Sequence, residues 1–191
     1  MLRRFEYGVL FAIVVHALVV AGTDCERSLY GFRPVWPNRL SGVGEFADVD
    51  GDGDLDLIAF YNDEISRMKS LVVLLNDGHA NFHPLPGMTV FESFYTVQGL
   101  LAADFDGDGR LDVVVLRSQN PVLRFLGKGD GTFSALEPAT FTSYGADETG
   151  VGDLDGDGRP DIMLCTGQRL RVLFNKGAFA FEMGPATEVE H

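Results

Sequence analysis

The chain has 191 residues, of which 46% are hydrophobic and 23% charged, so it can form the core of one domain and does not have the composition of a disordered protein. Its net charge of −13 and pI near 4.5 argue against nucleic acid as a partner, because phosphates require a basic surface, and against an anionic membrane surface. Thirteen of the 28 acidic residues lie within three nine-residue windows. The acidity is therefore local.

The N-terminal residues have the pattern of a secretory signal peptide. Arg3 and Arg4 form a basic start, an apolar run extends from Val9 to Ala21, and Gly22 precedes polar residues. The run has 13 residues, which is short for a membrane span of about 20. We predict a cleaved signal peptide over residues 1–22, hence a secreted, periplasmic or cell-surface protein with no membrane span after cleavage. An uncleaved anchor and a buried N-terminal helix are the alternatives.

The chain has two cysteines, Cys25 and Cys165. Export permits a disulfide between them. Cys165, however, also closes the apolar run Ile162–Leu164, where a thiol is typical of a small buried hydrophobic residue. Both interpretations stay open.

An aspartate-rich motif of nine residues occurs three times in the rest of the chain. It begins at Asp48, Asp104 and Asp153, and the copies read DVDGDGDLD, DFDGDGRLD and DLDGDGRPD. The starts lie 56 and 49 residues apart (104 − 48 and 153 − 104). Self-similarity at this period is typical of a repeat architecture.

Two short apolar runs follow each motif. Runs of four or five residues that are rich in Val, Ile, Leu and Phe and bounded by turn residues predict strands rather than helices. The first run of each pair is apolar almost throughout, so we expect it to be covered on both faces. The pairs are Leu57–Phe60 with Leu71–Leu75, Val113–Leu116 with Val122–Leu126, and Ile162–Cys165 with Leu170–Phe174.

A glycine-containing turn followed by phenylalanine stays in phase with the motif. It pairs Gly78 with Phe82, Gly129 with Phe133 and Gly177 with Phe181. Glycine supplies the positive φ of a tight hairpin turn, and the aromatic residue opens the next strand. Each unit is therefore predicted to run strand, acidic loop, strand, connection, strand, turn, strand. Four antiparallel strands in about 50 residues are typical of one β-propeller blade.

The acidic motif offers a set of ligands made only of oxygen. Positions 1, 3, 5 and 9 are aspartate in every copy, and glycines at positions 4 and 6 allow the loop to curl. Carboxylates about 5 Å apart repel by roughly 3 kcal/mol per pair at an effective dielectric near 20, a cost that a divalent cation reverses. Such ligands suit Ca²⁺ better than Mg²⁺, whereas zinc prefers His or Cys.

We therefore predict about three Ca²⁺ ions, one per loop. The side chains at positions 1, 3, 5 and 9 and the backbone carbonyl at position 7 are the expected ligands. They are Asp48, Asp50, Asp52, Asp54 and Asp56; Asp104, Asp106, Asp108, Arg110 and Asp112; and Asp153, Asp155, Asp157, Arg159 and Asp161.

An EF-hand begins with a similar loop but is excluded by position 12. That site requires a bidentate Glu at position 12 and a helix on each side. Here position 12 is Ala59, Val115 or Leu164, and the flanks are predicted strands.

The pattern Asp-x-Asp-Gly-Asp-Gly-x-x-Asp between strands, followed by the Gly-turn-Phe hairpin, resembles the FG-GAP/VCBS repeat, the calcium-loop blade of integrin α-subunit-type β-propellers. The resemblance covers about residues 40–185. It implies a β-propeller fold, one Ca²⁺ per loop and frequent roles in extracellular adhesion or binding, with some repeats serving as accessory modules on secreted enzymes. Such propellers commonly have about seven blades, and three copies cannot close a ring.

We accordingly predict an all-β protein, a β-propeller-type repeat of about three four-stranded antiparallel blades that form a partial or open propeller. The expected units are the signal peptide 1–22, an N-terminal extension 23–40, and repeats 41–95, 96–145 and 146–188. Exposed edge strands favour association. A homo-oligomer that completes the ring, further repeats, or a strand from Cys25–Leu40 that covers an edge are the alternatives.

The functional hypothesis is a non-enzymatic extracellular binding or adhesion module in which calcium is structural, with an unidentified protein or carbohydrate ligand. The alternative is an accessory module or fragment of a secreted calcium-dependent polysaccharide-degrading enzyme. An enzyme is expected to carry irregular insertions with acids or histidines at one end of the repeats. The two motif spacings differ by only seven residues (56 − 49), which favours binding, and no catalytic residue is predicted.

Overall fold

A computed structural model describes residues 40–62, 69–85, 89–91, 96–118, 121–143 and 145–188. These residues form fourteen strands and their connections. None of the described segments is a helix of the length and hydropathy needed to cross a bilayer. The predicted signal peptide and the extension up to residue 39, with Cys25, lie outside the described residues, while Cys165 is a half-buried free cysteine.

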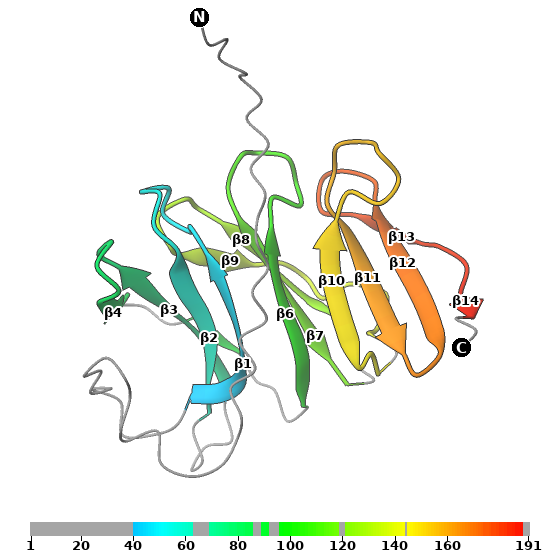
Figure 1. Cartoon of the computed structure of the whole chain (residues 1–191), viewed down its shortest axis with the longest axis horizontal. Coiled ribbons are helices and arrows are strands. Elements are labelled where there is room, and N and C mark those ends of the chain that lie inside the picture. Colours follow the sequence, from blue (N-terminus) through cyan, green and yellow to red (C-terminus); the bar gives the residue numbers. More distant parts are fainter. Residues whose placement is uncertain are drawn as a thin grey trace, which may run out of the picture.

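The strands form three antiparallel sheets side by side (Figure 1). The first sheet contains β1 (Leu40–Ala47), β2 (Asp56–Asn62), β3 (Lys69–Asn76), β4 (Phe82–Pro84) and β5 (Thr89–Phe91). The second contains β6 (Val97–Ala103), β7 (Asp112–Arg117), β8 (Leu123–Gly127) and β9 (Phe133–Ala135). The third contains β10 (Glu148–Gly152), β11 (Asp161–Thr166), β12 (Arg169–Asn175), β13 (Phe181–Met183) and β14 (Thr187–Glu188).

Each sheet is built on the same four-strand meander, which confirms the predicted all-β blade architecture. Two strands were not predicted. β5 pairs with β3 and β14 pairs with β12, each at the end of the long strand away from its hairpin. Because β4 and β13 have only three residues each, the first half of β3 and of β12 is left to pair with a further segment.

The hairpins have the predicted register. Asn76 pairs with Phe82 in the first sheet, and the equivalent pairs are Gly127 with Phe133 and Asn175 with Phe181. The turn glycines have positive φ angles of 76°, 72° and 86°, as a tight turn requires. Gly127 is needed for a different reason: a Cβ there would lie 2.0 Å from the carbonyl oxygen of Leu111, so the β8 backbone passes against the second acidic loop.

The sheets are arranged in an open fan, with β1, β6 and β10 adjacent and the first and third sheets on opposite sides of the second (Figure 1). All six residues of β7 are buried, as expected for a strand covered on both faces. Val113 and Val115 pack in a cluster with the first sheet, and Val114 and Leu116 pack with the third. Alternate side chains of one strand thus join both neighbours, and each such side chain contributes about 1.5–3 kcal/mol when fully buried.

Glu45 is an acid in the cluster between the first and second sheets. It pairs with Ile58 across the β1–β2 ladder, and paired residues project from the same face, so its carboxyl lies beside Ile58 and Ala47. The side chain is 5% exposed. Burial raises the pKa of Glu45 from 4.5 to about 7, and within the part of the chain that the structure describes no hydrogen bond or positive charge opposes this rise.

Glu45 should make the stability of the fold depend on pH. Its pKa is higher in the folded chain than in the unfolded chain, so ionisation favours unfolding. The free energy of unfolding should fall as pH rises from about 4.5 to about 7 and then level off. Glu45→Gln should remove this dependence and gain on the order of 2–3 kcal/mol at pH 8.

Urea unfolding of the wild type and the variant between pH 5 and pH 8 measures the difference. The exposed Glu148 of β10 gives a matched control, and Glu148→Gln should follow the wild type. Parallel curves for wild type and Glu45→Gln across this range would show that the Glu45 carboxyl does not titrate inside the fold.

Candidate metal centres

The three acidic loops lie at the same end of the three sheets (Figure 1). Each connects the first strand of its sheet to the second: residues 48–56 between β1 and β2, 104–112 between β6 and β7, and 153–161 between β10 and β11. We call these the first, second and third loops and number their residues 1 to 9. The loops start and end at equivalent places, because the strand pairs that close them are Ala47 with Asp56, Ala103 with Asp112 and Gly152 with Asp161.

The position-1 carboxylate organises each loop by accepting backbone N–H groups from across the turn. In the second loop, Asp104 Oδ1 accepts from Gly107 at 2.7 Å and Asp108 at 3.0 Å, and its Oδ2 accepts from Gly109 at 2.8 Å. Asp153 makes the same three contacts, and Asp48 accepts from its position-4 and position-6 glycines. The glycines at positions 4 and 6 have φ between 80° and 96°, which this curl requires.

The carboxylates at positions 3 and 5 continue the same arrangement. Asp106 Oδ1 accepts from the Asp108 N–H at 3.0 Å, and Asp108 Oδ1 accepts from the Arg110 N–H at 2.8 Å. Equivalent contacts occur in the first and third loops. These hydrogen bonds hold several negative charges on one side of a short loop.

The position-9 carboxylate is buried and joins the loop to the next hairpin. Asp112 is 1% exposed; its Oδ2 accepts from Phe105 at 3.0 Å and Asp106 at 3.2 Å, and its Oδ1 accepts from Gly127 at 2.9 Å. Asp56 and Asp161 are 0% exposed and join the same two places. Asp56 accepts from the N–H groups of Val49 and Asn76. Asp161 accepts from those of Leu154 and Asn175. The sequence predicted a metal ligand at position 9 and missed this scaffold role.

Burial raises the pKa of Asp112 to about 6, and the negative charge of Asp106 adds to the rise. The N–H groups of Gly127, Phe105 and Asp106 oppose it by favouring the ionised form. Burial also raises the pKa of Asp56, with a smaller contribution from neighbouring acids. A cation at these loops would favour the ionised carboxylates, so the donor set and the local field both suit a bound metal ion.

Three carboxylates converge in each loop, with one oxygen from each within 4.8 Å of the others. Two ligands of one Ca²⁺ at 2.3–2.6 Å can be at most about 5 Å apart, so each group fits a shared calcium ion. The groups are Asp48, Asp50 and Asp56; Asp104, Asp106 and Asp108; and Asp153, Asp155 and Asp161.

Some predicted ligands lie outside these groups. They are the side chains of Asp52, Asp112 and Asp157, and the residues at position 7, which were expected to contribute only a carbonyl.

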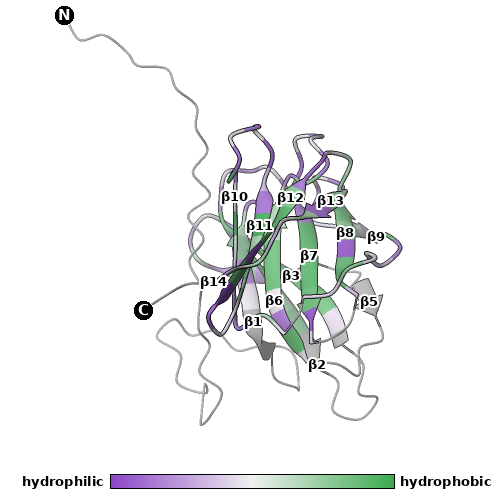
Figure 2. Cartoon of the chain, turned by 90° about the vertical axis from the view of Figure 1, so that its right-hand side faces the viewer, coloured by the Kyte–Doolittle hydropathy of each residue, from purple (hydrophilic) through white to green (hydrophobic). Residues whose placement is uncertain are grey.

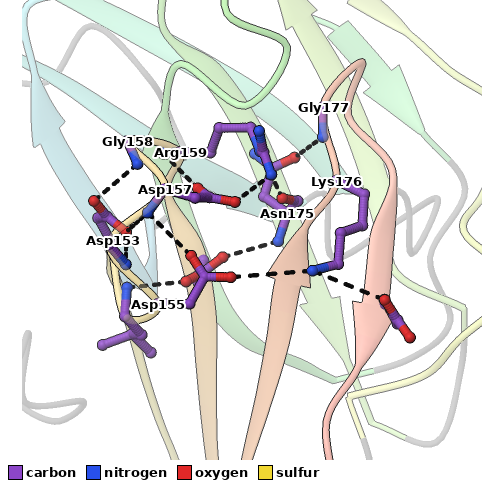
Figure 3. Close-up of polar contacts among 12 residues, drawn as sticks. Asp153, Asp155, Asp157, Gly158, Arg159, Asn175, Lys176 and Gly177 are labelled. Carbon is purple, nitrogen blue, oxygen red and sulfur yellow. Dashed lines mark hydrogen bonds and ion pairs between the residues drawn. The ribbon is translucent and has the colours of Figure 1, made fainter.

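Basic side chains distinguish the third loop from the first (Figure 3). Arg159 Nε donates to the Asn175 carbonyl at 2.8 Å, and its Nη2 pairs with Asp157. Lys176 Nζ lies 4.0 Å from Asp155 Oδ2. In the first loop position 7 is Asp54, and among the described residues no basic group pairs with that loop. The first loop therefore has the most negative field of the three.

Position 12 confirms that these loops are not EF-hands. Ala59, Val115 and Leu164 are 4%, 0% and 1% exposed and lie inside strands. An apolar residue within a sheet supplies no side-chain oxygen, and the described flanks are strands.

The model for the FG-GAP-like repeat matches residues 48–115 and 104–164, together more than half of the chain. No curated protein matches.

Among solved structures, the chain is similar to a lectin from Agrocybe aegerita whose structure was described for its specific recognition of non-reducing terminal N-acetylglucosamine. The TM-score is 0.51 at 26% sequence identity, over 76% of this chain and 37% of the lectin chain. This chain therefore spans little more than a third of that protein's length.

Positions 5 and 9 of the second loop should differ in their effect on stability. In excess chelator, Asp112→Ala should lower the free energy of unfolding by roughly 3–5 kcal/mol, because it leaves three buried or half-buried N–H groups without an acceptor. Asp108→Ala removes a partly exposed carboxylate and should cost less than about 1.5 kcal/mol. Urea unfolding measures both. Equal losses would mean that position 9 has no scaffold role beyond that of the other loop acids.

Proposed function

The chain belongs to the FG-GAP-like repeat family, and from this membership we propose that it is a calcium-binding extracellular binding module in which Ca²⁺ is structural. The observation that carries the proposal is the convergence of three carboxylates in each of three equivalent loops. One such cluster is common on protein surfaces. Three clusters at the same point of three repeats support a shared role.

The structural role of the metal follows from how each loop is connected. The position-9 carboxylate links the loop to the hairpin of the same sheet, and in the first two loops the position-2 residue, Val49 or Phe105, packs against the next sheet. A bound cation would remove the repulsion between the exposed carboxylates and stiffen the loop between these two attachments. Calcium would then stabilise both the individual sheet and its contact with its neighbour.

Calcium should therefore raise the melting temperature, and excess EGTA should lower it. At free Ca²⁺ ten times the dissociation constant, each site adds roughly 1.4 kcal/mol, so three sites add about 4 kcal/mol. Differential scanning calorimetry with a calcium titration checks this, with Mg²⁺ at the same concentration as the comparison. A melting temperature that is the same in EGTA and in millimolar Ca²⁺ would exclude the structural role.

The extracellular part of the proposal rests on the sequence of residues 1–22, whose basic start, apolar run and small-residue exit are those of a secretory signal. A secreted, periplasmic or cell-surface location also supplies the millimolar calcium that weak loop sites require.

The proposed ligand is a carbohydrate. The support is the similarity in fold and sequence to the Agrocybe aegerita lectin, whose structure was described for its recognition of non-reducing terminal N-acetylglucosamine. A protein ligand, as in adhesion, is the other occupant consistent with a repeat of this family, and an accessory role on a secreted polysaccharide-degrading enzyme is the alternative function.

A glycan array probed with the full chain in Ca²⁺ tests the carbohydrate proposal. We expect calcium-dependent binding to a restricted group of glycans, with those ending in N-acetylglucosamine as the first candidates. The array is repeated in EGTA, where binding should be lost together with the fold.

Screens for hydrolase and lyase activity on the bound glycans separate the module from an enzyme. Turnover that disappears in EGTA would contradict the non-enzymatic proposal. Absence of binding to every glycan would contradict the carbohydrate ligand and leave the calcium proposal intact, because that proposal is tested by thermal stability.

A further inference from the structure

The three acidic loops, which Figure 2 shows as hydrophilic segments at one end of the sheets, differ in charge at two places. One is position 7 of the loop, and the other is the residue directly before the turn glycine of the same sheet's hairpin. At both places the first repeat has an acid and the other two repeats have a base, a difference of four in formal charge (+2 against −2). The residues are Asp54 with Asp77, Arg110 with Lys128, and Arg159 with Lys176.

The side chain at position 7 lies against the hairpin turn in all three repeats. A Cβ at Gly78 would lie 2.6 Å from Asp54 Oδ2, and a Cβ at Gly129 would lie 3.3 Å from Arg110 Cδ. Arg159 Nε donates to a backbone carbonyl of its hairpin at 2.8 Å. The position-7 charge is therefore held between the loop and the turn, where it adds to the loop carboxylates in the first repeat and offsets them in the other two.

In the third loop both basic side chains pair with loop carboxylates (Figure 3). Arg159 pairs with Asp157, and Lys176 Nζ lies 4.0 Å from Asp155 Oδ2. Asp155 belongs to the converging group of this loop, so Lys176 lies beside a carboxylate that a bound cation would share. Positive side chains at this range repel a divalent cation and lower its affinity for the loop.

Lys176 also has a second acid within reach. Its Nζ lies 3.8 Å from Glu182 Oε2 on β13 and 5.2 Å from the centre of the Phe174 ring. The side chains of Lys176 and Glu182 are 41% and 72% exposed, so their ion pair is weak. A cation at the loop would displace Lys176 from Asp155 toward Glu182, and Glu182 thus limits how far Lys176 weakens the site.

The second loop is intermediate in its charge. Arg110 Nη1 lies 3.5 Å from Asp108 Oδ2, which belongs to the converging group. Lys128, the equivalent of Lys176, is exposed. Within the described part of the chain, the first loop has no ion pair with a basic side chain, the second has one and the third has two.

We propose that the three loops bind Ca²⁺ with graded affinity, the first loop at the lowest free calcium and the third at the highest. This inference rests on the proposed calcium function and adds the order in which the sites fill. The affinity of calcium loops varies with the charge of the site. Because the first and third sites differ by four formal charges, their dissociation constants should differ about tenfold or more. The third loop is then the site whose occupancy responds to a change in calcium.

NMR spectroscopy of the full chain labelled with ¹⁵N-glycine measures each loop separately. The position-6 glycine donates its N–H to the position-1 carboxylate, so its amide shift reports on its own loop. Free Ca²⁺ is lowered from saturation with EGTA, and circular dichroism on the same samples verifies that the chain stays folded while the third loop releases its ion. The Gly158 amide should change first, Gly109 next and Gly53 last, with the outer midpoints about tenfold or more apart.

Charge variants test the cause of the order. Lys176→Gln and Arg159→Gln should each lower the dissociation constant of the third loop about threefold or more and leave the first loop unchanged. Glu182→Gln should raise it, because Lys176 then pairs with Asp155 alone. Arg169→Gln is the matched control, since it removes the same charge from the other end of β12, roughly 20 Å from Lys176 at about 3.3 Å per residue. It should leave all three midpoints unchanged.

The outcomes separate the order of filling from calcium binding itself. Equal midpoints, a third loop that binds more tightly than the first, or a Lys176→Gln chain whose third loop is no tighter than the wild type would each overturn the graded order and leave the calcium proposal standing. Three amides that do not respond to calcium at all would overturn the calcium proposal, and the order with it.

Discussion

The buried aspartate at position 9 is the interaction on which the rest of each repeat depends. A loop of nine residues with four or five carboxylates is unfavourable by itself, since like charges at short range repel. Asp56, Asp112 and Asp161 offset this by placing both carboxylate oxygens on backbone N–H groups, one set in the loop and one at the hairpin. Such charge-assisted hydrogen bonds, shielded from water, fix where the loop leaves the first strand and enters the second.

The aspartates at position 9 and at positions 1 and 3 look alike in the sequence but differ in burial and in hydrogen-bond partners. The position-9 carboxylates are buried and accept hydrogen bonds from the hairpin as well as from the loop. The carboxylates at positions 1 and 3 are half-buried or exposed and accept backbone hydrogen bonds from within the loop. Asp56 and Asp161 still share an ion-sized cluster with those outer groups, so one carboxylate can serve the scaffold and the cation together. The charge around the loops is also graded, because Arg159 and Lys176 offset the third loop while Asp54 adds to the first.

The middle sheet joins the other two through both faces of its second strand. Every residue of β7 is buried, and its alternate side chains complete the clusters on both sides. A repeat of this kind obtains much of its core from its neighbours, because each sheet buries apolar side chains against the next one. Met163 and Cys165 are half-buried, whereas their equivalents Ile58 and Phe60 in the first sheet, and Val114 and Leu116 in the second, are fully buried.

The sequence by itself determined the repeat, because the acidic motif recurs three times. It also determined the strands, the hairpins and the exclusion of an EF-hand, because each of these depends on residues within about ten positions of one another, such as Gly78 with Phe82 or Asp48 with Ala59. Only the tertiary structure decided the rest. The position-9 link joins Asp112 to Gly127, 15 residues away, and the contact between sheets joins Phe105 to Asn175, 70 residues away. Burial of Glu45, exposure of Leu154 and the pairing of β5 and β14 likewise depend on which segments meet in space. A pattern shows which residues are acidic or apolar, but their protonation, burial and partners are set by neighbours that are distant in the chain.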